Sequence, residues 1–246
     1  MTTKACCDGG LPANDNSRDA PKGELLMLGD LPCYEVGHGA KAVIAVYDIF
    51  GFDVKRTKLV CDQISQAGYR VILPDFFRGS DVLKEFGSFP PPGGIEDVVS
   101  WVTRVAPFDK TVKEVLGAVT THLESKGAKS IGILGFCWGG KIVMKTCTGD
   151  EKKIKCGCGI HPSFLEASDV EAVNVPQAFM PAGNDPPIDP VWDAIKRKPF
   201  HSDCFLKVFK ESVHGWSLRS DMSDARAAAL ANEAIELTIQ FFNNNL

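Results

Sequence analysis

The sequence predicts an α/β protein with a doubly wound, mainly parallel sheet and helices on both faces. Short apolar runs of strand length alternate with longer amphipathic runs along most of the chain, which is the pattern of βα units. Several short runs are apolar throughout, as expected of strands buried on both faces. The chain has 246 residues, 44% of them hydrophobic and 24% charged, so it is long enough for one such domain with a full core.

The chain is expected to start with a mobile arm and to continue as a single domain. Residues 1–23 are rich in Asp, Asn, Gly, Pro and Lys and show no periodicity, which is typical of a disordered segment. We therefore expect one domain at 24–246. The arm carries the pair Cys6-Cys7; an accidental exposed pair and a modification or redox site both remain open.

The elements of the expected domain follow in chain order. Weak alternation at 24–28 and 32–36, joined near Gly29-Asp30, predicts an antiparallel hairpin at a sheet edge. Continuous apolar runs predict the other strands, at 42–47, 71–73, 130–134, 155–160, 177–181 and 204–209. Amphipathic spacing predicts the helices, at 55–67, 82–86, 95–104, 110–126, 191–198, 221–242 and directly after Cys137.

Residues 80–107 form a Pro-rich insertion between two expected elements of the core. The run Phe89-Pro90-Pro91-Pro92-Gly93-Gly94 cannot be regular structure, so short helices are expected only on either side of it. The insertion follows the end of the strand at 71–73, on the side where open α/β sheets bind ligands. A lid that shapes the substrate site and a simple surface excursion are both compatible with this position.

Charge and composition exclude several classes of partner. The net charge is −4 and there is no basic run, which argues against nucleic acid and anionic membranes. No apolar stretch approaches the roughly 20 residues of a membrane helix. The polar start lacks the apolar segment of a signal peptide, so we expect a cytoplasmic protein that acts on a small molecule. The sequence gives no indication of the oligomeric state.

The nine cysteines do not form a disulfide or metal framework. Their number is odd, they are scattered, and none is spaced as Cys-x-x-Cys. Cys156-Gly157-Cys158 is too closely spaced for a standard zinc site and has no matching second pair. We expect reduced thiols, most of them in the core, and no metal site.

One cysteine lies in a motif with a chemical purpose. In Gly135-Phe136-Cys137-Trp138-Gly139, an apolar strand ends, Cys137 follows at a sharp turn, and an apolar helical pattern begins. This is the arrangement of a nucleophile elbow, with sulfur in place of the usual serine oxygen. The glycines leave room for a strained turn, and the helix N-terminus favours a thiolate. The alternative is an inert buried cysteine on a Gly-rich turn.

Two further residues complete a candidate triad. Asp185 and His214 each come just after an expected strand, as Cys137 does. Since parallel strands end on one edge of the sheet, these loops should converge. The chain order of nucleophile, acid and histidine is that of α/β-hydrolases. His214 would accept the thiol proton and Asp185 would orient the imidazole. Each residue also has a simpler explanation: Asp185 could belong only to a turn, with Asp189 as a competing acid, and His214 could be an ordinary loop residue.

The same edge should carry the groups that surround the nucleophile. Backbone N–H groups of Trp138 and Ile49 are expected to form the oxyanion hole. Asp48 ends an apolar strand close to the elbow, where it would oppose ionisation of the thiol or hydrogen-bond to it, unless it only caps the next turn. Candidate substrate-binding residues on the loops of this edge are Arg78, Arg219 and His161, although solvated arginines would also explain the first two.

From about Gly23 to its end the chain resembles the dienelactone hydrolase family of the α/β-hydrolase superfamily. The motifs that carry the resemblance are Asp48-Ile49-Phe50-Gly51, Pro74-Asp75-Phe76, Gly135-Phe136-Cys137-Trp138-Gly139-Gly140, Asn184-Asp185 and His214-Gly215. The resemblance implies a triad of Cys137, His214 and Asp185, hydrolysis of a lactone or small ester, and no cofactor.

The resemblance also implies roles around the triad. Asp48 resembles the position of a carboxylate that holds the resting thiol until an anionic lactone displaces it, although bacterial members carry Glu there. Arg219 is a near match to one of two arginines that bind the substrate carboxylate in bacterial members. Arg78 is only a weak candidate for the other, so the natural substrate is not fixed by the resemblance.

The sequence therefore predicts a carboxylic ester hydrolase of the carboxymethylenebutenolidase type that works through a thioester on Cys137. The alternative is a non-catalytic protein on the same fold that responds to redox state or binds a small molecule, because fold alone does not fix function. A cysteine near a helix N-terminus can be oxidised reversibly. Turnover of an activated ester, with an acyl adduct on Cys137, distinguishes the two.

Overall fold

The computed structural model describes residues 19–148 and 153–246, and its centre is one eight-stranded sheet with the strand order β1-β2-β4-β3-β5-β6-β7-β8. The strands are β1 (Glu24–Leu28), β2 (Leu31–Val36), β3 (Lys41–Val46), β4 (Arg70–Pro74), β5 (Ser130–Phe136), β6 (Ile154–Ile160), β7 (Gln177–Met180) and β8 (Phe205–Leu206). The pairs β1–β2 and β2–β4 are antiparallel, and the neighbouring strands from β4 through β3 to β8 pair in parallel. The predicted fold class is confirmed.

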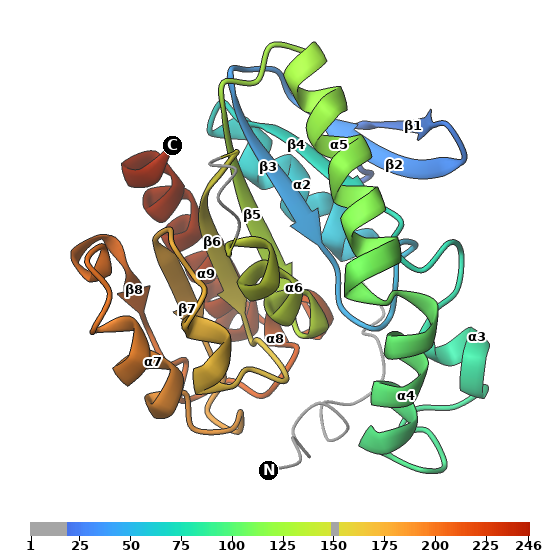
Figure 1. The fold of residues 1–246 in the computed structure, drawn as a ribbon. Helices are drawn as coiled ribbons and strands as arrows, with labels where there is room; N and C mark the ends of the chain where they lie inside the picture. Colours follow the sequence, from blue (N-terminus) through green and yellow to red (C-terminus); the bar gives the residue numbers. More distant parts are fainter. Residues whose placement is uncertain (1–18, 149–152) are drawn as a thin grey trace.

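Helices cover both faces of this sheet (Figure 1). The helices α5 and α6 lie on the near face in Figure 1, and α2 and α9 lie behind the sheet. The α-helices are α2 (Lys55–Gln66), α3 (Val82–Phe86), α4 (Ile95–Val105), α5 (Lys113–Ser125), α6 (Trp138–Thr146), α7 (Asp189–Ile195), α8 (Trp216–Arg219) and α9 (Ala225–Asn245). Among the described residues no helix is long and apolar enough to span a membrane.

The central strands are buried because both of their faces carry helices. In β3 every residue after Lys41 is buried, and in β5 every residue after Ser130. The two strands pair in parallel from Lys41 opposite Ser130 to Val46 opposite Gly135. The continuous apolar runs of the sequence are explained by this double burial. The pairing also places the carboxyl ends of β3 and β5 next to each other, which sets the position of the site.

Three of the differences between the observed and the predicted strand and helix limits have a clear structural description. The last strand is shorter than expected, because β8 has a neighbour on one side only and the pairing beyond it is reduced to a bridge between Ala182 and Phe209. The helix expected at 110–126 starts with a π-helical turn at Phe108–Val112. The last helix starts later than expected, since the Asp224 carboxylate accepts from the N–H groups of the first turn of α9.

The first described residues are attached to the domain. Lys22 N–H donates to the Asp62 carboxylate (2.9 Å) and Gly23 N–H donates to the Tyr34 hydroxyl (2.7 Å). The contacts with the domain thus start slightly before β1. The rest of the expected arm, up to residue 18 and including Cys6-Cys7, lies outside the described residues.

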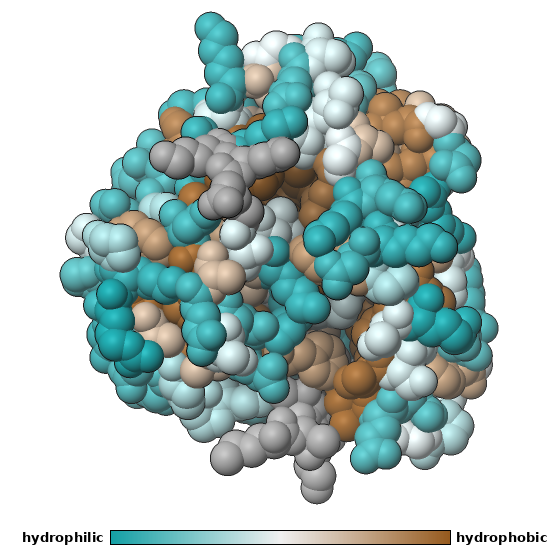
Figure 2. Space-filling model, viewed as in Figure 1, coloured by the Kyte–Doolittle hydropathy of each residue, from teal (hydrophilic) through white to brown (hydrophobic). Residues whose placement is uncertain are grey.

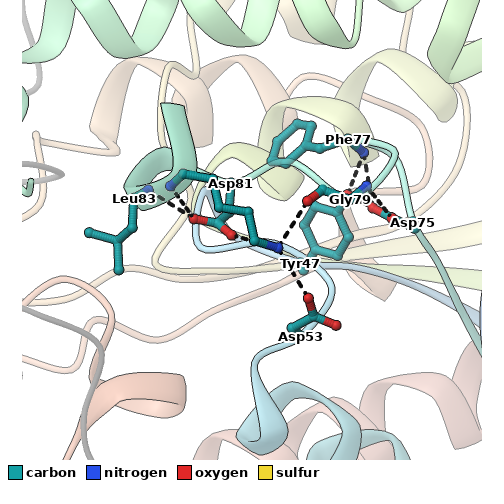
Figure 3. Close-up of polar contacts among 8 residues, drawn as sticks. Tyr47, Asp53, Asp75, Phe77, Gly79, Asp81 and Leu83 are labelled. Atoms are coloured by element: carbon teal, nitrogen blue, oxygen red, sulfur yellow. Dashed lines mark hydrogen bonds and ion pairs between the residues drawn. The ribbon is translucent and has the colours of Figure 1, made fainter. Parts of the chain in front are cut away.

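The Pro-rich insertion contains the two expected helices, α3 and α4. The Asp81 carboxylate caps α3 by accepting from Leu83 N–H and Lys84 N–H. The Lys84 ammonium also donates to the Asp53 carboxylate and the Gly79 carbonyl, which joins the loops after β3 and β4. Figure 3 shows Asp53, Gly79 and Asp81 of these loops close together. Phe89 packs on Phe50 with ring centroids 5.0 Å apart. The insertion is therefore packed over the carboxyl edge of the sheet.

Candidate active site

The turn after β5 has the geometry of a nucleophile elbow. Cys137 has φ 53° and ψ −115°, a strained conformation for a residue with a side chain, and α6 starts at the next residue. Added Cβ atoms would lie 2.1 Å from the Gly139 carbonyl oxygen at Gly135, and 2.5 Å from the Val46 carbonyl oxygen at Gly139. Both positions require glycine because the backbone passes so closely there.

The imidazole of His214 is held by the loop that follows β7. Its Nδ1 lies 2.5 Å from Oδ1 of Asp185. The other Asp185 oxygen accepts from Ala182 N–H (2.7 Å), and the Asn184 side-chain oxygen accepts from His214 N–H (2.7 Å). The two loops are thus joined through side chain and backbone. This fixes the ring plane of His214 and leaves Nε2 as the nitrogen on the opposite side of the ring.

The pKa of His214 indicates how the imidazole and the sulfur interact. Burial alone would lower this pKa, because it disfavours the charged ring. The charge of Cys137 and the hydrogen bond to Asp185 outweigh burial and raise the pKa to about 9. The raised pKa favours a protonated imidazole at neutral pH. A positive charge at this place would stabilise a negative charge on a neighbouring sulfur.

A serine that the sequence analysis did not select also contacts the sulfur. Ser163 Oγ lies 3.4 Å from Cys137 Sγ, and Ser163 N–H donates to the Cys137 carbonyl (2.9 Å). Ser163 is buried on the loop after β6, the strand that pairs with β5. The rule that placed the triad at the carboxyl edge of the sheet applies to this loop as well, so its position could have been predicted, although the hydroxyl contact could not.

Asp48 and Arg219 form a buried pair next to the elbow. Arg219 Nε lies 3.7 Å from Oδ2 of Asp48, and Oδ1 of Asp48 accepts from Phe50 N–H (3.0 Å). Burial raises the pKa of Asp48 to about 6; the Arg219 charge opposes this shift, and repulsion by Cys137 adds to it. The effect of Cys137 on the pKa of Asp48 indicates that the two side chains lie close enough to interact.

Arg219 has a further set of neighbours on the same loops. Its guanidinium carbon lies 4.8 Å from the centre of the Phe50 ring, and its Nη2 donates to the His214 carbonyl (3.3 Å). The side chain is nearly fully buried. Arg219 therefore links the loop after β3 to the loop that carries His214, and the Asp48 carboxylate partly neutralises the charge of the guanidinium.

The two N–H groups expected in the oxyanion hole lie on adjacent loops. Trp138 is the first residue of α6, and Ile49 follows Asp48 after β3. The Ile49 carbonyl accepts from Val82 N–H (3.0 Å), which anchors this peptide to the start of the insertion. In the part of the chain that the structure describes, neither the Trp138 nor the Ile49 amide donates to a backbone acceptor.

The two remaining candidates lie in different places. His161 is buried against His214, with ring centroids 4.9 Å apart, and its Nε2 lies 2.9 Å from Ser217 Oγ. Burial and the neighbouring charges of His214 and Arg219 hold its pKa well below the usual value, which favours the neutral form of this side chain. Arg78 instead pairs with Asp30 in the β1–β2 turn (3.1 Å), several strands away from β5.

Metal ligands are not gathered in the described part of the chain. Over residues 19–148 and 153–246 no group of three or more His, Cys, Asp and Glu side chains is arranged to hold a metal ion. The described cysteines are free thiols. The chemical groups gathered at the carboxyl edge are thus a sulfur, an imidazole and carboxylates, with backbone amides around them.

The chain matches the model of a known protein family. The model of the dienelactone hydrolase family matches residues 34–246, which is most of the chain and includes Cys137, Asp185 and His214.

Curated relatives are similar over most of their length. The carboxymethylenebutenolidase homolog of Mus musculus is 32% identical over 193 residues, which cover 75% of each chain. Hydrolase pyvD of Aspergillus violaceofuscus is 26% identical over 255 residues, covering 98% of this chain and 96% of the relative.

A solved structure supports the fold. Dienelactone hydrolase from Anabaena variabilis superposes with a TM-score of 0.63 at 18% identity, covering 91% of this chain and 97% of that chain. At this identity the likeness concerns the fold alone, which is an α/β-hydrolase fold with a mostly parallel sheet.

Proposed function

The chain belongs to the dienelactone hydrolase family, whose members are hydrolases, and from that premise we propose that it hydrolyses small lactones or carboxylic esters through nucleophilic catalysis by Cys137. One observation supports this most strongly. The His214 imidazole lies 2.5 Å from Asp185 and, despite burial, has a pKa raised to about 9 by Cys137 and Asp185. A protonated imidazole beside a thiolate suits attack on an activated carbonyl.

In the proposed acylation step, the Cys137 sulfur attacks the carbonyl carbon of the substrate. A C–S bond forms, and the negative charge moves to the carbonyl oxygen, where the N–H groups of Ile49 and Trp138 would stabilise it. The C–O bond to the leaving group then breaks, and the His214 imidazolium gives its proton to the departing alkoxide. The products of this step are a thioester on Cys137 and an alcohol, which stays attached to the acyl group when the substrate is a lactone.

Hydrolysis of the thioester returns the enzyme to its resting state. Neutral His214 takes a proton from a water molecule, and the resulting hydroxide attacks the thioester carbon. The C–S bond breaks and the sulfur leaves as thiolate beside the regenerated imidazolium. Asp185 keeps the imidazole in the orientation that both steps need, and no cofactor enters the cycle.

We propose that Asp48 and Arg219 gate the thiol rather than take part in bond changes. The negative charge of Asp48 opposes a negative charge on Cys137, and Arg219 reduces this opposition by pairing with Asp48 at 3.7 Å. A substrate that shifts the Arg219 pair would change how readily the sulfur ionises. Arg78, which pairs with Asp30, is not assigned a part in this step.

The function is tested by replacing the nucleophile and following covalent chemistry. Cys137→Ala should abolish turnover of 4-nitrophenyl acetate, and Cys137→Ser should be severely impaired, because the serine hydroxyl ionises far less readily than a thiol. Cys204→Ala, a partly buried thiol at the β8 edge, serves as the matched control and should retain turnover. Circular dichroism and thermal melting confirm that each variant folds.

Mass spectrometry of the stopped reaction separates the hydrolase from its alternative. An acyl group is expected on the peptide that contains Cys137. Full turnover in Cys137→Ala would rule the mechanism out. Loss of a Cys137 signal after peroxide treatment, without turnover of any ester, would instead favour a redox-responsive protein, because the same thiolate is also the species that peroxide oxidises.

A further inference from the structure

A large cavity lies next to the elbow, between the insertion and the helices at the carboxyl edge. Its volume is about 1020 Å³, which is at the upper end of the roughly 300–1,000 Å³ of ligand pockets. One wall is formed by α4, including Ile95, Val99 and Val102. Figure 2 shows hydrophobic side chains on the side of α4 that faces α6.

The opposite wall continues directly from the proposed catalytic residues. Trp138 lines the cavity and follows Cys137 in the chain. Phe164 follows the serine that contacts the sulfur, and Pro186 follows Asp185; both line the same cavity. A substrate whose carbonyl is at Cys137 would therefore have the rest of its structure within reach of this space.

The cavity offers little to attract an anion. Its cationic lining residues are Lys141 and Lys145. The Lys141 ammonium is held by both oxygens of Asp169 at 2.7 Å, and the Lys145 ammonium lies over the Phe108 ring at 5.1 Å from its centre. The lining also includes the carboxylates of Glu96 and Glu166, which would repel a negatively charged group.

The arginine of the site is engaged elsewhere. The Arg219 side chain is nearly fully buried, where it pairs with Asp48 and stacks on Phe50, and it is not among the residues that line the cavity. An anionic group in the cavity would therefore not meet the guanidinium, and one that reached it would have to compete with Asp48.

We propose that the cavity binds a large, apolar and uncharged part of the substrate, so that the preferred substrates are neutral esters or lactones with a bulky alkyl or aromatic group. The inference rests on the proposed function, since it concerns the substrate of the same site. Val99 is a specificity-determining residue in this arrangement. It is 42% exposed although apolar, and it faces the cavity from the insertion.

Three 4-nitrophenyl esters test this inference: the acetate, the octanoate and the hydrogen suberate. The suberate has the same chain length as the octanoate and differs by a terminal carboxylate. Because apolar area buried on binding contributes to the specificity constant, kcat/KM should be at least tenfold higher for octanoate than for acetate. It should also be at least tenfold higher for octanoate than for suberate, measured below the concentrations at which the esters form micelles.

Substitution of the cavity wall provides a second readout. Val99→Asp should lower the octanoate-to-acetate ratio of kcat/KM by about tenfold, since it places a carboxylate in the apolar wall. Val99→Leu, which keeps the wall apolar, should preserve the ratio. Leu25→Asp is the matched control: Leu25 is an exposed apolar residue of β1 outside the cavity, and its replacement should leave the ratio unchanged.

The outcomes separate this inference from the proposed function. Equal kcat/KM for acetate and octanoate, or a preference for suberate, overturns the inference while hydrolysis through Cys137 stands. An unchanged ratio in Val99→Asp also overturns it. No turnover of any of the three esters contradicts the proposed function, and the inference fails with it.

Discussion

Two buried cysteines near the centre of the sheet have opposite chemical environments. Cys137 follows β5 directly and Cys158 lies within β6, opposite Leu134; both side chains are fully buried. Burial raises the pKa of Cys158 to about 12, and the hydrogen bond with Thr238 only partly opposes that shift. Cys137 instead lies beside an imidazole that is protonated at neutral pH and precedes the first turn of α6.

The comparison shows that burial by itself makes a thiol inert. A thiolate inside an apolar strand has no positive charge nearby that would stabilise it, so the thiol stays protonated. At the carboxyl edge of the sheet, the loops after β7 and β8 hold His214 where its charge can act on the Cys137 sulfur, which lies on the strained turn. The difference between the two cysteines is therefore set by position in the sheet, which the following experiments address.

The largest effect is expected when the imidazole is removed. His214→Ala should lower kcat/KM for 4-nitrophenyl acetate by about 10³-fold or more, because the imidazolium that would stabilise the attacking thiolate is lost. Iodoacetamide should then alkylate Cys137 at a rate closer to that of Cys158. Alkylation of each peptide is followed by mass spectrometry.

The control for this variant is a histidine away from the site. His201 is exposed in a short 3-10 helix before β8, and His201→Ala should retain wild-type turnover. If His214→Ala kept more than a tenth of wild-type kcat/KM, Cys137 would not depend on this imidazole and the contrast with Cys158 would need another explanation.

The second prediction concerns pH. The pKa of His214 is about 9, because Cys137 and Asp185 outweigh the effect of burial. Below this pH the imidazole carries the proton that acylation delivers to the leaving group, and above it the proton is lost. We expect kcat/KM for phenyl acetate to fall about tenfold per pH unit above pH 9.

Alkylation provides the matching measurement. The sulfur remains a thiolate above pH 9, so the rate of iodoacetamide labelling at Cys137 should not fall where turnover does. A profile in which both rates declined together would show that the alkaline limb reflects unfolding or another group, and not the proton on His214.

The third prediction is smaller and concerns the serine next to the sulfur. Ser163→Ala removes the hydroxyl that lies 3.4 Å from Cys137 Sγ. A hydrogen bond of this kind contributes about 1 kcal/mol, so kcat/KM should fall roughly fivefold. Ser125→Ala on α5, whose hydroxyl bonds to the His122 carbonyl, is the control and should retain turnover. Identical kinetics of Ser163→Ala and wild type would mean that this contact does not act on the thiolate.

These experiments concern features that the sequence predicted to different degrees. The elbow, Asp185 and His214 were predictable because each follows a strand, and strands in a parallel sheet end on one edge. The helices of the insertion were also predicted correctly, since Asp81 and the Pro-rich run mark their limits. For such features local sequence signals and global fold agree.

Other features depend on side-chain packing that no local signal carries. Arg78 and Arg219 both lie on loops expected at the carboxyl edge, and only the family resemblance favoured Arg219 over Arg78. Arg78 has φ 53° and its guanidinium turns to Asp30 of the edge hairpin, whereas Arg219 is drawn in by Asp48 and Phe50. The partners in each case come from distant parts of the chain, so only the folded structure decides between the two.

The smallest effect on activity is expected at Cys158 itself. Its sulfur lies 3.6 Å from the Thr238 hydroxyl and contributes to the core between β6 and α9. Cys158→Ala should leave kcat/KM within twofold of wild type, because this thiol stays protonated at the pH of the assay. Its cost should appear in stability instead, at about 1–2 kcal/mol for the lost sulfur and the small cavity left behind, as measured by urea denaturation. A large loss of turnover with unchanged stability would mean that the β6 thiol has a chemical role, and the division between a reactive cysteine at the sheet edge and an inert one inside the sheet would no longer hold.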